Sequence, residues 1–179
     1  MSPTPKLRLA TAVALLLAGS PAVAQTSGNT IDFSQLGSAS SVLIQQAGTG
    51  NAISGAQNGV DNLVYIVQRN SGNSITATQD ESTDSDVRLT QIGSDGAIEA
   101  RQSATASVLS IRDTGSGSSF TAGQTGEDNL INILNTADDV MMTVDQAGDR
   151  NALLIATSTP NSVINVTQDG ADNVLSIRQ

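Results

Sequence analysis

Apolar and polar residues alternate through fourteen short segments that recur about every eleven residues along the chain. In each segment two alternate positions are apolar in 27 of 28 cases, with Gly55 as the exception, whereas only 16 of the 42 flanking positions are apolar. A period of two places alternate side chains on opposite faces of a strand, so the pattern predicts fourteen strands with one buried face. The residues that we expect on this face include Val42, Ile44, Val64, Ile66, Ile131, Ile133, Leu153, Ile155, Ile164, Val166, Leu175 and Ile177.

Side-chain amides mark both ends of each segment. The last position, here called the Gln position, holds Gln in 11 of 14 cases, and the Asn position six residues earlier holds Asn in seven. Both positions lie an even number of residues from the apolar positions, so their side chains face inward with them. Burying an unpaired amide there costs ~1–3 kcal/mol of stability. Stacking on the same amide of a neighbouring coil would remove that cost. The predicted ladder residues are Asn29, Gln35, Gln46, Asn51, Gln57, Asn62, Gln68, Asn73, Gln79, Gln91, Gln102, Gln124, Asn129, Gln146, Asn151, Gln168, Asn173 and Gln179.

The four residues between a Gln position and the next Asn position supply the turns, for example residues 47–50, 58–61, 147–150 and 169–172. They are rich in Gly, Asn and Asp, which accept or tolerate a positive φ. One extra residue lies between Gln79 and Ser85. Two strands and two turns occupy 22 residues, so the predicted fold is all-β, a flat two-sheet β-solenoid of seven units with amyloid-like cross-β stacking. Seven coils at ~4.8 Å would span about 34 Å.

Residues 1–24 have the layout of a secretory signal peptide. Lys6 and Arg8 form a basic start, an apolar stretch follows, and Ala22-Val23-Ala24 is an A-x-A cleavage site. We therefore expect a signal peptide at 1–24 and a repeat domain at 25–179. Cleavage would leave six arginines against 17 acids, a formal charge of −11.

The composition excludes several kinds of chemistry. Without cysteine or histidine there is no thiol nucleophile, disulfide or imidazole base. An acidic chain lacks the basic footprint of a nucleic-acid-binding protein. We expect no enzyme activity, no cofactor or metal and no small-molecule substrate. Twelve acids fall in the predicted turns, where they are typical of solvated turn residues. The alternative interpretation is that stacked like charges slow premature assembly during export.

One stretch resembles the repeat of a known family. Its residues are Ser40-x5-Gln46-x-Gly48-x-Gly50-Asn51-x-Ile53-x3-Gln57. This is similar to the curlin repeat, S-x5-Q-x-G-x-G-N-x-A-x3-Q, with Ile53 where the family usually has Ala. Half-repeats of the same spacing run over residues 57–68, 124–135, 146–157 and 168–179. The resemblance therefore covers nearly all of the chain from Asn29 to Gln179.

Curlins are secreted subunits of curli, the extracellular functional amyloid fibres of Gram-negative bacteria, which support adhesion and biofilm matrix. The resemblance implies an extracellular fibre on the cell surface, with this chain and other curlin-type subunits as partners. It also implies export through a dedicated outer-membrane channel. Family members commonly carry an export-targeting segment of some twenty residues before the first repeat, whereas here the pattern begins at Asn29. Degenerate central repeats would suit a minor or nucleating subunit.

Two further interpretations remain at this point. A capped β-solenoid adhesin would stay monomeric after secretion. A calcium-dependent β-roll would need G-G-x-G-x-D nonapeptides, whereas the period here is eleven. A β-helix enzyme would need clustered acids with an adjacent base, and the adjacent pair Asp138 and Asp139 reads as turn chemistry.

Overall fold

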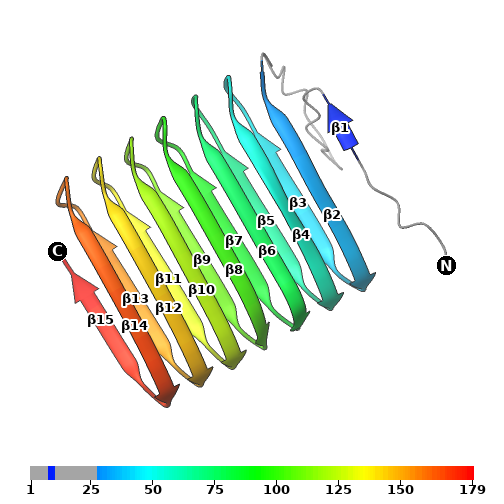
Figure 1. The fold of residues 1–179 in the computed structure, drawn as a ribbon, viewed down its shortest axis with the longest axis vertical. Helices are drawn as coiled ribbons and strands as arrows, with labels where there is room; N and C mark the ends of the chain where they lie inside the picture. The colour runs from blue at the N-terminus through cyan, green and yellow to red at the C-terminus, as the bar shows by residue number, and fades with distance from the viewer. Residues whose placement is uncertain (1–7, 11–27) are drawn as a thin grey trace, which may run out of the picture.

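The computed structural model describes residues 8–10 and 28–179, which form strands and turns. Figure 1 shows the strands side by side in two sheets, with the coils following one another from β2 to β15. Sheet A contains β2 (Thr30–Ser38), β4 (Ala52–Val60), β6 (Ser74–Thr83), β8 (Ala97–Thr105), β10 (Ser119–Glu127), β12 (Met141–Asp149) and β14 (Val163–Ala171). Sheet B contains β3 (Ser41–Gln46), β5 (Leu63–Gln68), β7 (Asp86–Gln91), β9 (Val108–Asp113), β11 (Leu130–Asn135), β13 (Ala152–Thr157) and β15 (Val174–Arg178).

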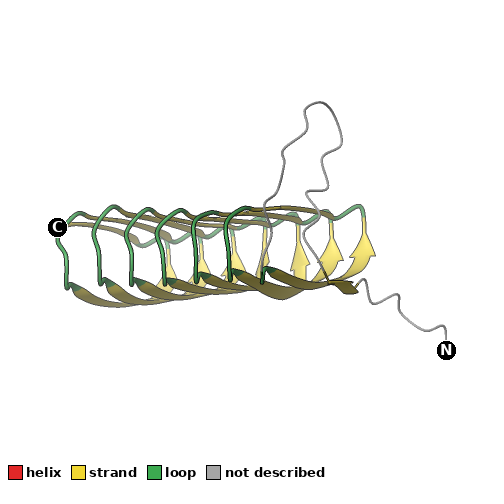
Figure 2. Cartoon of the chain, turned by 90° about the horizontal axis from the view of Figure 1, so that it is seen from above, coloured by secondary structure: helices red, strands yellow, loops and turns green. Residues whose placement is uncertain are grey.

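These fourteen strands pair in parallel and step along the sequence by one 22-residue unit. Phe120 of β10, for example, pairs with Ile98 of β8 on one side and with Met142 of β12 on the other. Seen from above in Figure 2, the two sheets form two layers joined by turns at their edges. The predicted all-β, two-sheet solenoid of about seven coils is therefore confirmed.

The extra residue of the repeat lies within a strand. The register of β6 against its neighbours shifts between Gln79 and Thr83, so that Gly59 pairs with Ser82. This is a β-bulge, which lets one strand carry an additional residue without ending the ladder. The extra residue stands in the expected stretch, but within β6 and not in a separate turn.

The prediction that the four residues after each Gln position supply the turn is wrong for sheet A. Strands of sheet A continue for three residues past the Gln position, as in β12, which runs to Asp149 and keeps its pairing with β14 through Ala147, Gly148 and Asp149. Strands of sheet B end at or next to the Gln position and are followed by an irregular turn. In β12 glycine lets the extended end bend, since Gly148 has a φ of 103° while its pairing with β14 continues.

The interior between the sheets is filled by the predicted alternating residues. Eight of the twelve named above are buried, namely Val64, Ile66, Ile131, Ile133, Leu153, Ile155, Ile164 and Val166. The other four lie in the two end coils: Val42, Ile44 and Ile177 are half-buried, and Leu175 is 37% exposed. The prediction of a buried Leu175 is wrong because β15 is the last strand of sheet B and no further coil covers it.

Most of the predicted signal peptide lies outside the described residues. Its residues Arg8–Ala10 form β1, which pairs antiparallel with residues 30–32 of β2 at the edge of sheet A. In the part of the chain that the structure describes, no helix is long and apolar enough to cross a membrane.

Candidate functional site

A continuous ladder of glutamine amides runs through sheet A. Each Nε2 donates to the Oε1 of the glutamine one coil further on, over distances of 2.8–3.0 Å. The six members are Gln57, Gln79, Gln102, Gln124, Gln146 and Gln168, all of them buried. Their donation always runs from the N-terminal coil to the C-terminal coil, so the ladder has a direction.

The same amides also close the corner between the sheets. The Nε2 of Gln79 donates to the carbonyl of Ser85 at 2.7 Å, and that of Gln146 donates to the carbonyl of Leu130 at 3.2 Å. Each of the first five amides thus binds the start of a sheet B strand as well as the next glutamine. Both hydrogens of the amide are satisfied, which removes the cost of burying it.

The first predicted member does not join this ladder. The Nε2 of Gln35 donates to the carbonyl of Ser40 within its own coil, and the buried Oε1 of Gln57 has no partner within the described chain. Gln35 is exposed because only β1 lies beyond β2 in the sheet. The sequence-based assignment of Gln35 to the ladder is therefore wrong for this structure.

The ladder of sheet B is shorter. Gln46 donates to Gln68 at 2.9 Å and Gln68 to Gln91 at 3.3 Å, and the series then stops because the Nε2 of Gln91 has no partner among the described residues. Asp113 and Asn135 occupy the next two positions, and there the donation reverses, with Asn135 Nδ2 donating back to Asp113 Oδ1 at 2.8 Å. An ionised carboxylate can only accept, so it cannot pass the donation on.

Gln91 and Asp113 lie against Gly96. This glycine stands at an Asn position, where a Cβ would lie 2.6 Å from Gln91 Nε2 and 3.5 Å from Asp113 Oδ2. Asp113 Oδ2 also has no partner within the described chain. Burial raises the pKa of Asp113 to about 6 from 3.8, hydrogen bonds from Asn135 and the Gly115 amide lower it, and the charge of Asp138 raises it. In the sequence, Asp113 occupies one of the three Gln positions that hold another residue.

The end of the sheet B series also departs from the prediction. Gln179 is exposed, and its backbone, not its amide side chain, pairs with Ala156 and Ser158. The buried Oγ1 of Thr157 has no partner among the described residues. Gln179 therefore terminates the strand without extending an amide ladder.

Apart from one pair, the asparagines do not stack amide on amide, which corrects the second half of the ladder prediction. The exception is Asn173, whose Nδ2 donates to Asn151 Oδ1 at 3.1 Å. The Oδ1 of each of the others accepts the backbone N–H one coil further on, as from Asn51 to Asn29 at 2.9 Å and from Asn151 to Asn129 at 2.9 Å. The Nδ2 of Asn151 donates to carbonyls of Ala147 and Gly170 in the corner. The N–H groups of Asn51 and Asn151 lie between strands, and the asparagine side chain of the preceding coil satisfies them.

Serine does the same work where asparagine is absent. The Oγ of Ser107 accepts the backbone N–H of Asn129 at 3.0 Å, and that of Ser118 accepts the N–H of Val140 at 3.2 Å. Exposed Asn173 occupies the last coil, with its N–H donating to Asn151 at 3.0 Å. The predicted Asn29, Asn51, Asn62, Asn73, Asn129 and Asn151 are all buried.

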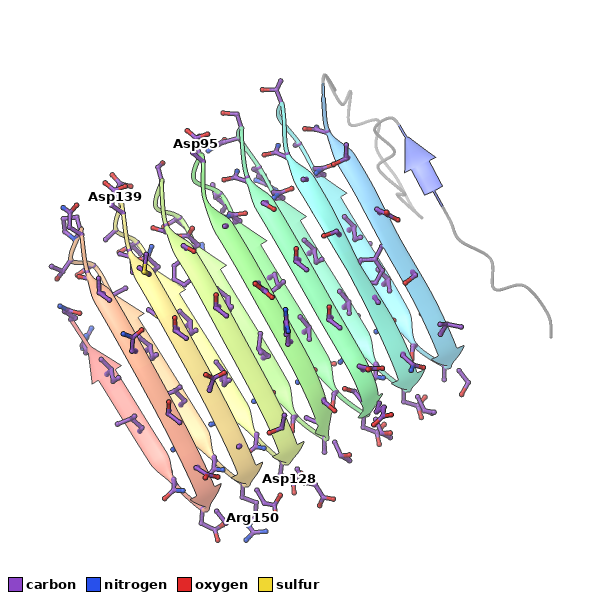
Figure 3. The ribbon with its side chains drawn as sticks, viewed as in Figure 1. Asp95, Asp128, Asp139 and Arg150 are labelled. Atoms are coloured by element: carbon purple, nitrogen blue, oxygen red, sulfur yellow. The ribbon has the colours of Figure 1, made fainter. Side chains whose placement is uncertain are left out.

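The residue before each Asn position has a positive φ of 51–76°, in all fourteen corners. Most of these residues are Gly, Asp or Asn, which explains why many turn acids stand there. Figure 3 shows Asp95 and Asp139 at one edge of the solenoid and Asp128 and Arg150 at the other. Turn acids thus stand at both edges of the solenoid.

One arginine stands among the turn acids at one of these edges. Arg150 donates to Asp172 of the next coil at 2.6 Å and 2.9 Å. The hydrogen bond from Arg150 lowers the pKa of Asp172, and the same bond raises the pKa of Arg150. The charges of the nearby Asp149 and Asp128 also raise the pKa of Arg150. Both side chains are exposed, so this pair shapes local charge and adds little to stability.

Both ends of the solenoid carry strands with a partner on one side only. At one end β3 is the edge of sheet B, and β2 is covered only along the three residues that pair with β1. At the other end β14 and β15 are both edges. Their unpaired N–H and C=O groups can pair with another strand.

Within residues 8–10 and 28–179 no group of three or more Asp or Glu side chains is placed to hold a metal ion. Comparisons with protein-family models, with curated proteins and with solved structures give no match for this chain. The candidate functional features are therefore the inward amides and the edge strands at the two ends.

Proposed function

We propose that this protein is an exported structural subunit that polymerises end to end into extracellular, curli-like amyloid fibres for adhesion and biofilm matrix. The activity is assembly, with no chemical step. The observation that carries the proposal is the match between the two ends. Strands β2 and β14 both have nine residues, and β3 and β15 have six and five. All four run parallel to their sheet neighbours in the solenoid, so a second copy would continue both sheets in register.

The direction of the glutamine ladder supports head-to-tail addition. Gln168 accepts from Gln146, and its own Nε2 has no acceptor in the described part of this chain. In a fibre the next amide would be Gln35 of the following copy, whose Nε2 already binds Ser40 and whose Oε1 can accept. Donation would then continue in one direction through the junction, and the unpaired end amides would become buried pairs.

The partners of such a subunit are further copies of itself and other curlin-type subunits. The curlin resemblance supports export through an outer-membrane channel with accessory factors, and a location on the surface of a Gram-negative cell. Residues 1–24 supply the proposed inner-membrane export signal. Seeding between this chain and a major curlin, in both directions, distinguishes a nucleating subunit from a bulk subunit.

The first test uses the chain expressed with its complete N-terminal segment in a Gram-negative host and recovered outside the cytoplasm. Mass spectrometry defines its N-terminus. We expect thioflavin fluorescence to rise with time, and fibres to diffract at ~4.7–4.8 Å. A soluble product that stays dye-negative with and without seeds would contradict the proposal.

A pair of variants then tests the ends. Leu175→Lys changes an inward side chain that is 37% exposed in the single chain and would be covered by the next copy. We expect it to prevent elongation while preserving the fold, because a lysine charge would be buried at the junction. Val60→Lys is the matched control, since Val60 is 41% exposed in an interior coil. Equal elongation by both variants would contradict growth through this end.

A monomeric β-solenoid adhesin is the second candidate function. The observation in its favour is β1, which covers residues 30–32 at one end of sheet A. A secreted product that retains residues 8–10 and remains a monomer would support this candidate. Folding that depends on added Ca²⁺ would instead favour the calcium-binding form of it.

A further inference from the structure

The two outer faces of the solenoid differ in composition. Eleven of the 16 outward apolar residues belong to sheet B and five to sheet A. Sheet A presents ten Ser and Thr side chains on its outer face instead. Leu43, Leu134 and Leu154 of sheet B are 40–42% exposed. Sheet B therefore has an apolar outer face that nothing in the described chain covers, which is the feature of an interaction surface.

Charge divides between the same two faces. Arg88 pairs with Asp86 on sheet B at 2.6 Å, and Arg101 pairs with Glu99 on sheet A at 2.5 Å. The remaining charged residues are of opposite sign on the two faces. They are Arg112 and Arg178 on sheet B, and Asp32 and Asp145 on sheet A, none of which has an ion-pair partner within the described residues.

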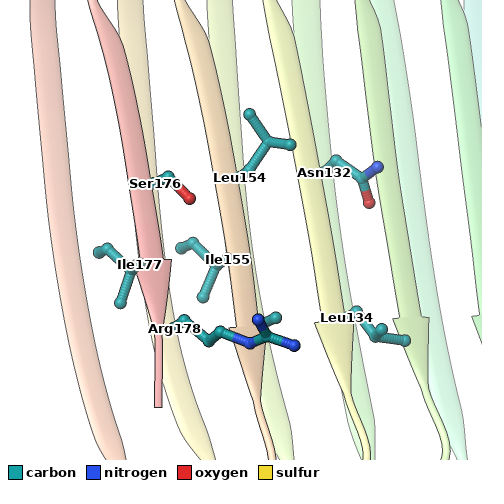
Figure 4. Close-up of a pocket in the computed structure, with 8 residues that line it drawn as sticks. Asn132, Leu134, Leu154, Ile155, Ser176, Ile177 and Arg178 are labelled. Carbon is teal, nitrogen blue, oxygen red and sulfur yellow. The ribbon is translucent and has the colours of Figure 1, made fainter.

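Each outer face also has a hollow. Leu134 and Leu154 stand beside a shallow hollow on sheet B near Arg178, as Figure 4 shows. On sheet A, Gly123 leaves a hollow that is lined by Arg101, Asp145 and Thr167 among others. A protruding leucine of one copy could fill such a hollow in another.

We infer that the outer face of sheet B packs on the outer face of sheet A of a second copy, so that solenoids associate laterally as well as end to end. Two sheet B faces would bring Arg112 and Arg178 against their own copies, which like charge disfavours. The contact joins different faces, so it does not close into a dimer and repeats from one solenoid to the next. The inference rests on the proposed fibre function for its effect on assembly.

The size of the face explains how lateral packing depends on fibre growth. Seven strands at ~4.8 Å, with six residues per strand at ~3.3 Å, give a face of about 650 Å². A stable interface buries about 800 Å² on each partner, so a single pair of copies associates weakly. Copies joined end to end present many such faces at once, and the contacts then reinforce one another.

Three variants test this contact. Leu154→Asp places an acid on the apolar face, and Thr143→Lys places a base on the exposed, acidic face of sheet A. Each should lower the fraction of laterally paired filaments in electron micrographs by about tenfold, because a charge is buried without a partner. Val60→Asp, at a corner residue with 41% exposure against 42% for Leu154, should leave pairing unchanged. Leu134→Asp is the third test variant and repeats the change on sheet B at a second leucine. Circular dichroism checks that each variant folds.

The outcomes separate this inference from the proposed function. Normal elongation with lost pairing in Leu154→Asp and Thr143→Lys supports the contact. Loss of lateral pairing in Leu154→Asp but not in Thr143→Lys would overturn the role of sheet A. Unchanged pairing in both Leu154→Asp and Leu134→Asp would overturn the contact. If the wild-type chain forms no filaments, the proposed fibre function is wrong. Sedimentation at high protein concentration then tests whether single copies associate through the contact between the two faces. Weak association that Leu154→Asp abolishes supports the contact, and a strict monomer overturns it.

Discussion

Asp113 stands at a Gln position of sheet B. At the equivalent positions of sheet A, each ladder glutamine between the two end members both donates and accepts a hydrogen bond. As a carboxylate Asp113 accepts from Asn135 but cannot donate, and Gln91 on its other side keeps an unpaired Nε2. The inward residues of β7, β8, β10 and β11 carry no titratable group, and the exposed Asp138 supplies the neighbouring charge. The centre of the solenoid therefore contains one acid whose neutral form suits its site better than its ionised form.

Replacing Asp113 with Asn tests that statement. A raised pKa means that the folded protein binds the proton more tightly than the unfolded chain, so stability falls as the pH rises from about 4 through about 6. Asp113→Asn should raise the free energy of unfolding at pH 7 and remove this part of the pH dependence. Urea unfolding at pH 4 and pH 7 measures both. Asp145→Asn, at an exposed strand position, is the control, and an unchanged slope in Asp113→Asn would reject the assignment.

Backbone conformation explains a second group of residues. Ala106 has a φ of 51° before an Asn position where most corners have Gly, Asp or Asn. A left-handed backbone costs a residue with a Cβ ~1–2 kcal/mol. Glycine avoids this cost, but its greater freedom in the unfolded chain offsets part of the gain. Ala106→Gly should therefore stabilise the protein by about 0.5–1 kcal/mol in urea unfolding.

Ala97→Gly is the matched control for Ala106→Gly, because Ala97 lies in β8 with a strand backbone. It should destabilise by about the same amount, since glycine weakens a strand. Equal effects of the two changes would contradict the backbone explanation.

At the scale of elements, close stacking at the corners depends on glycine, in sheet A at Gly148 and in the sheet B corner at Gly48. A Cβ on Gly148 would lie 1.8 Å from the carbonyl oxygen of Gly170 in the next coil. Coils can stack here only where that position carries no side chain or where the backbone shifts. The bent ends of the sheet A strands therefore depend on a column of small residues.

Gly148→Ala should destabilise the protein by roughly 2 kcal/mol or more, since it adds a collision to an unfavourable φ. Gly50→Ala is the control. Its φ is also positive, at 65°, but the nearest atom to an added Cβ is 3.9 Å away. We expect about 1 kcal/mol for that change from the backbone alone. Thermal unfolding of the two variants measures the difference, and equal losses would show that stacking distance is unimportant.

The whole molecule behaves as a linear array in which each coil contacts its neighbours. Deleting residues 141–162 removes β12 and β13 and joins Val140 to Val163. Val163 pairs with Met141 in the intact chain, so it takes the equivalent place after Val140. The shorter chain should fold with the loss of one coil and one interface. Deleting only residues 141–151 would instead place sheet B strands in sheet A, with the wrong corners, and should unfold the C-terminal coils. Hydrogen exchange measures both, and similar protection in the two deletions would contradict the distinction between corners.

Charge also acts at this scale. The stacked coils bring Asp61 and Asp84 to equivalent corner positions of neighbouring coils, and the chain from residue 28 onward has six arginines against 17 acids. Fibre formation should accelerate as the pH falls from 7 to 4, because the carboxylates lose their charge, and as salt screens them. The lag time of thioflavin fluorescence measures this. An unchanged lag between pH 7 and pH 4 would rule out the proposed brake on assembly.

The sequence by itself determined the strands, their inward residues and the 22-residue step, because a side-chain period of two and a repeat of eleven are both local properties. Only the tertiary structure decided how the inward polar groups pair. Gln146 reaches the next glutamine, whereas the shorter Asn151 binds backbone groups of the corner. The reversal at Asp113 and the unequal corners have the same origin. A hydrogen-bond partner depends on the path of the neighbouring backbone, which no single segment of the sequence specifies.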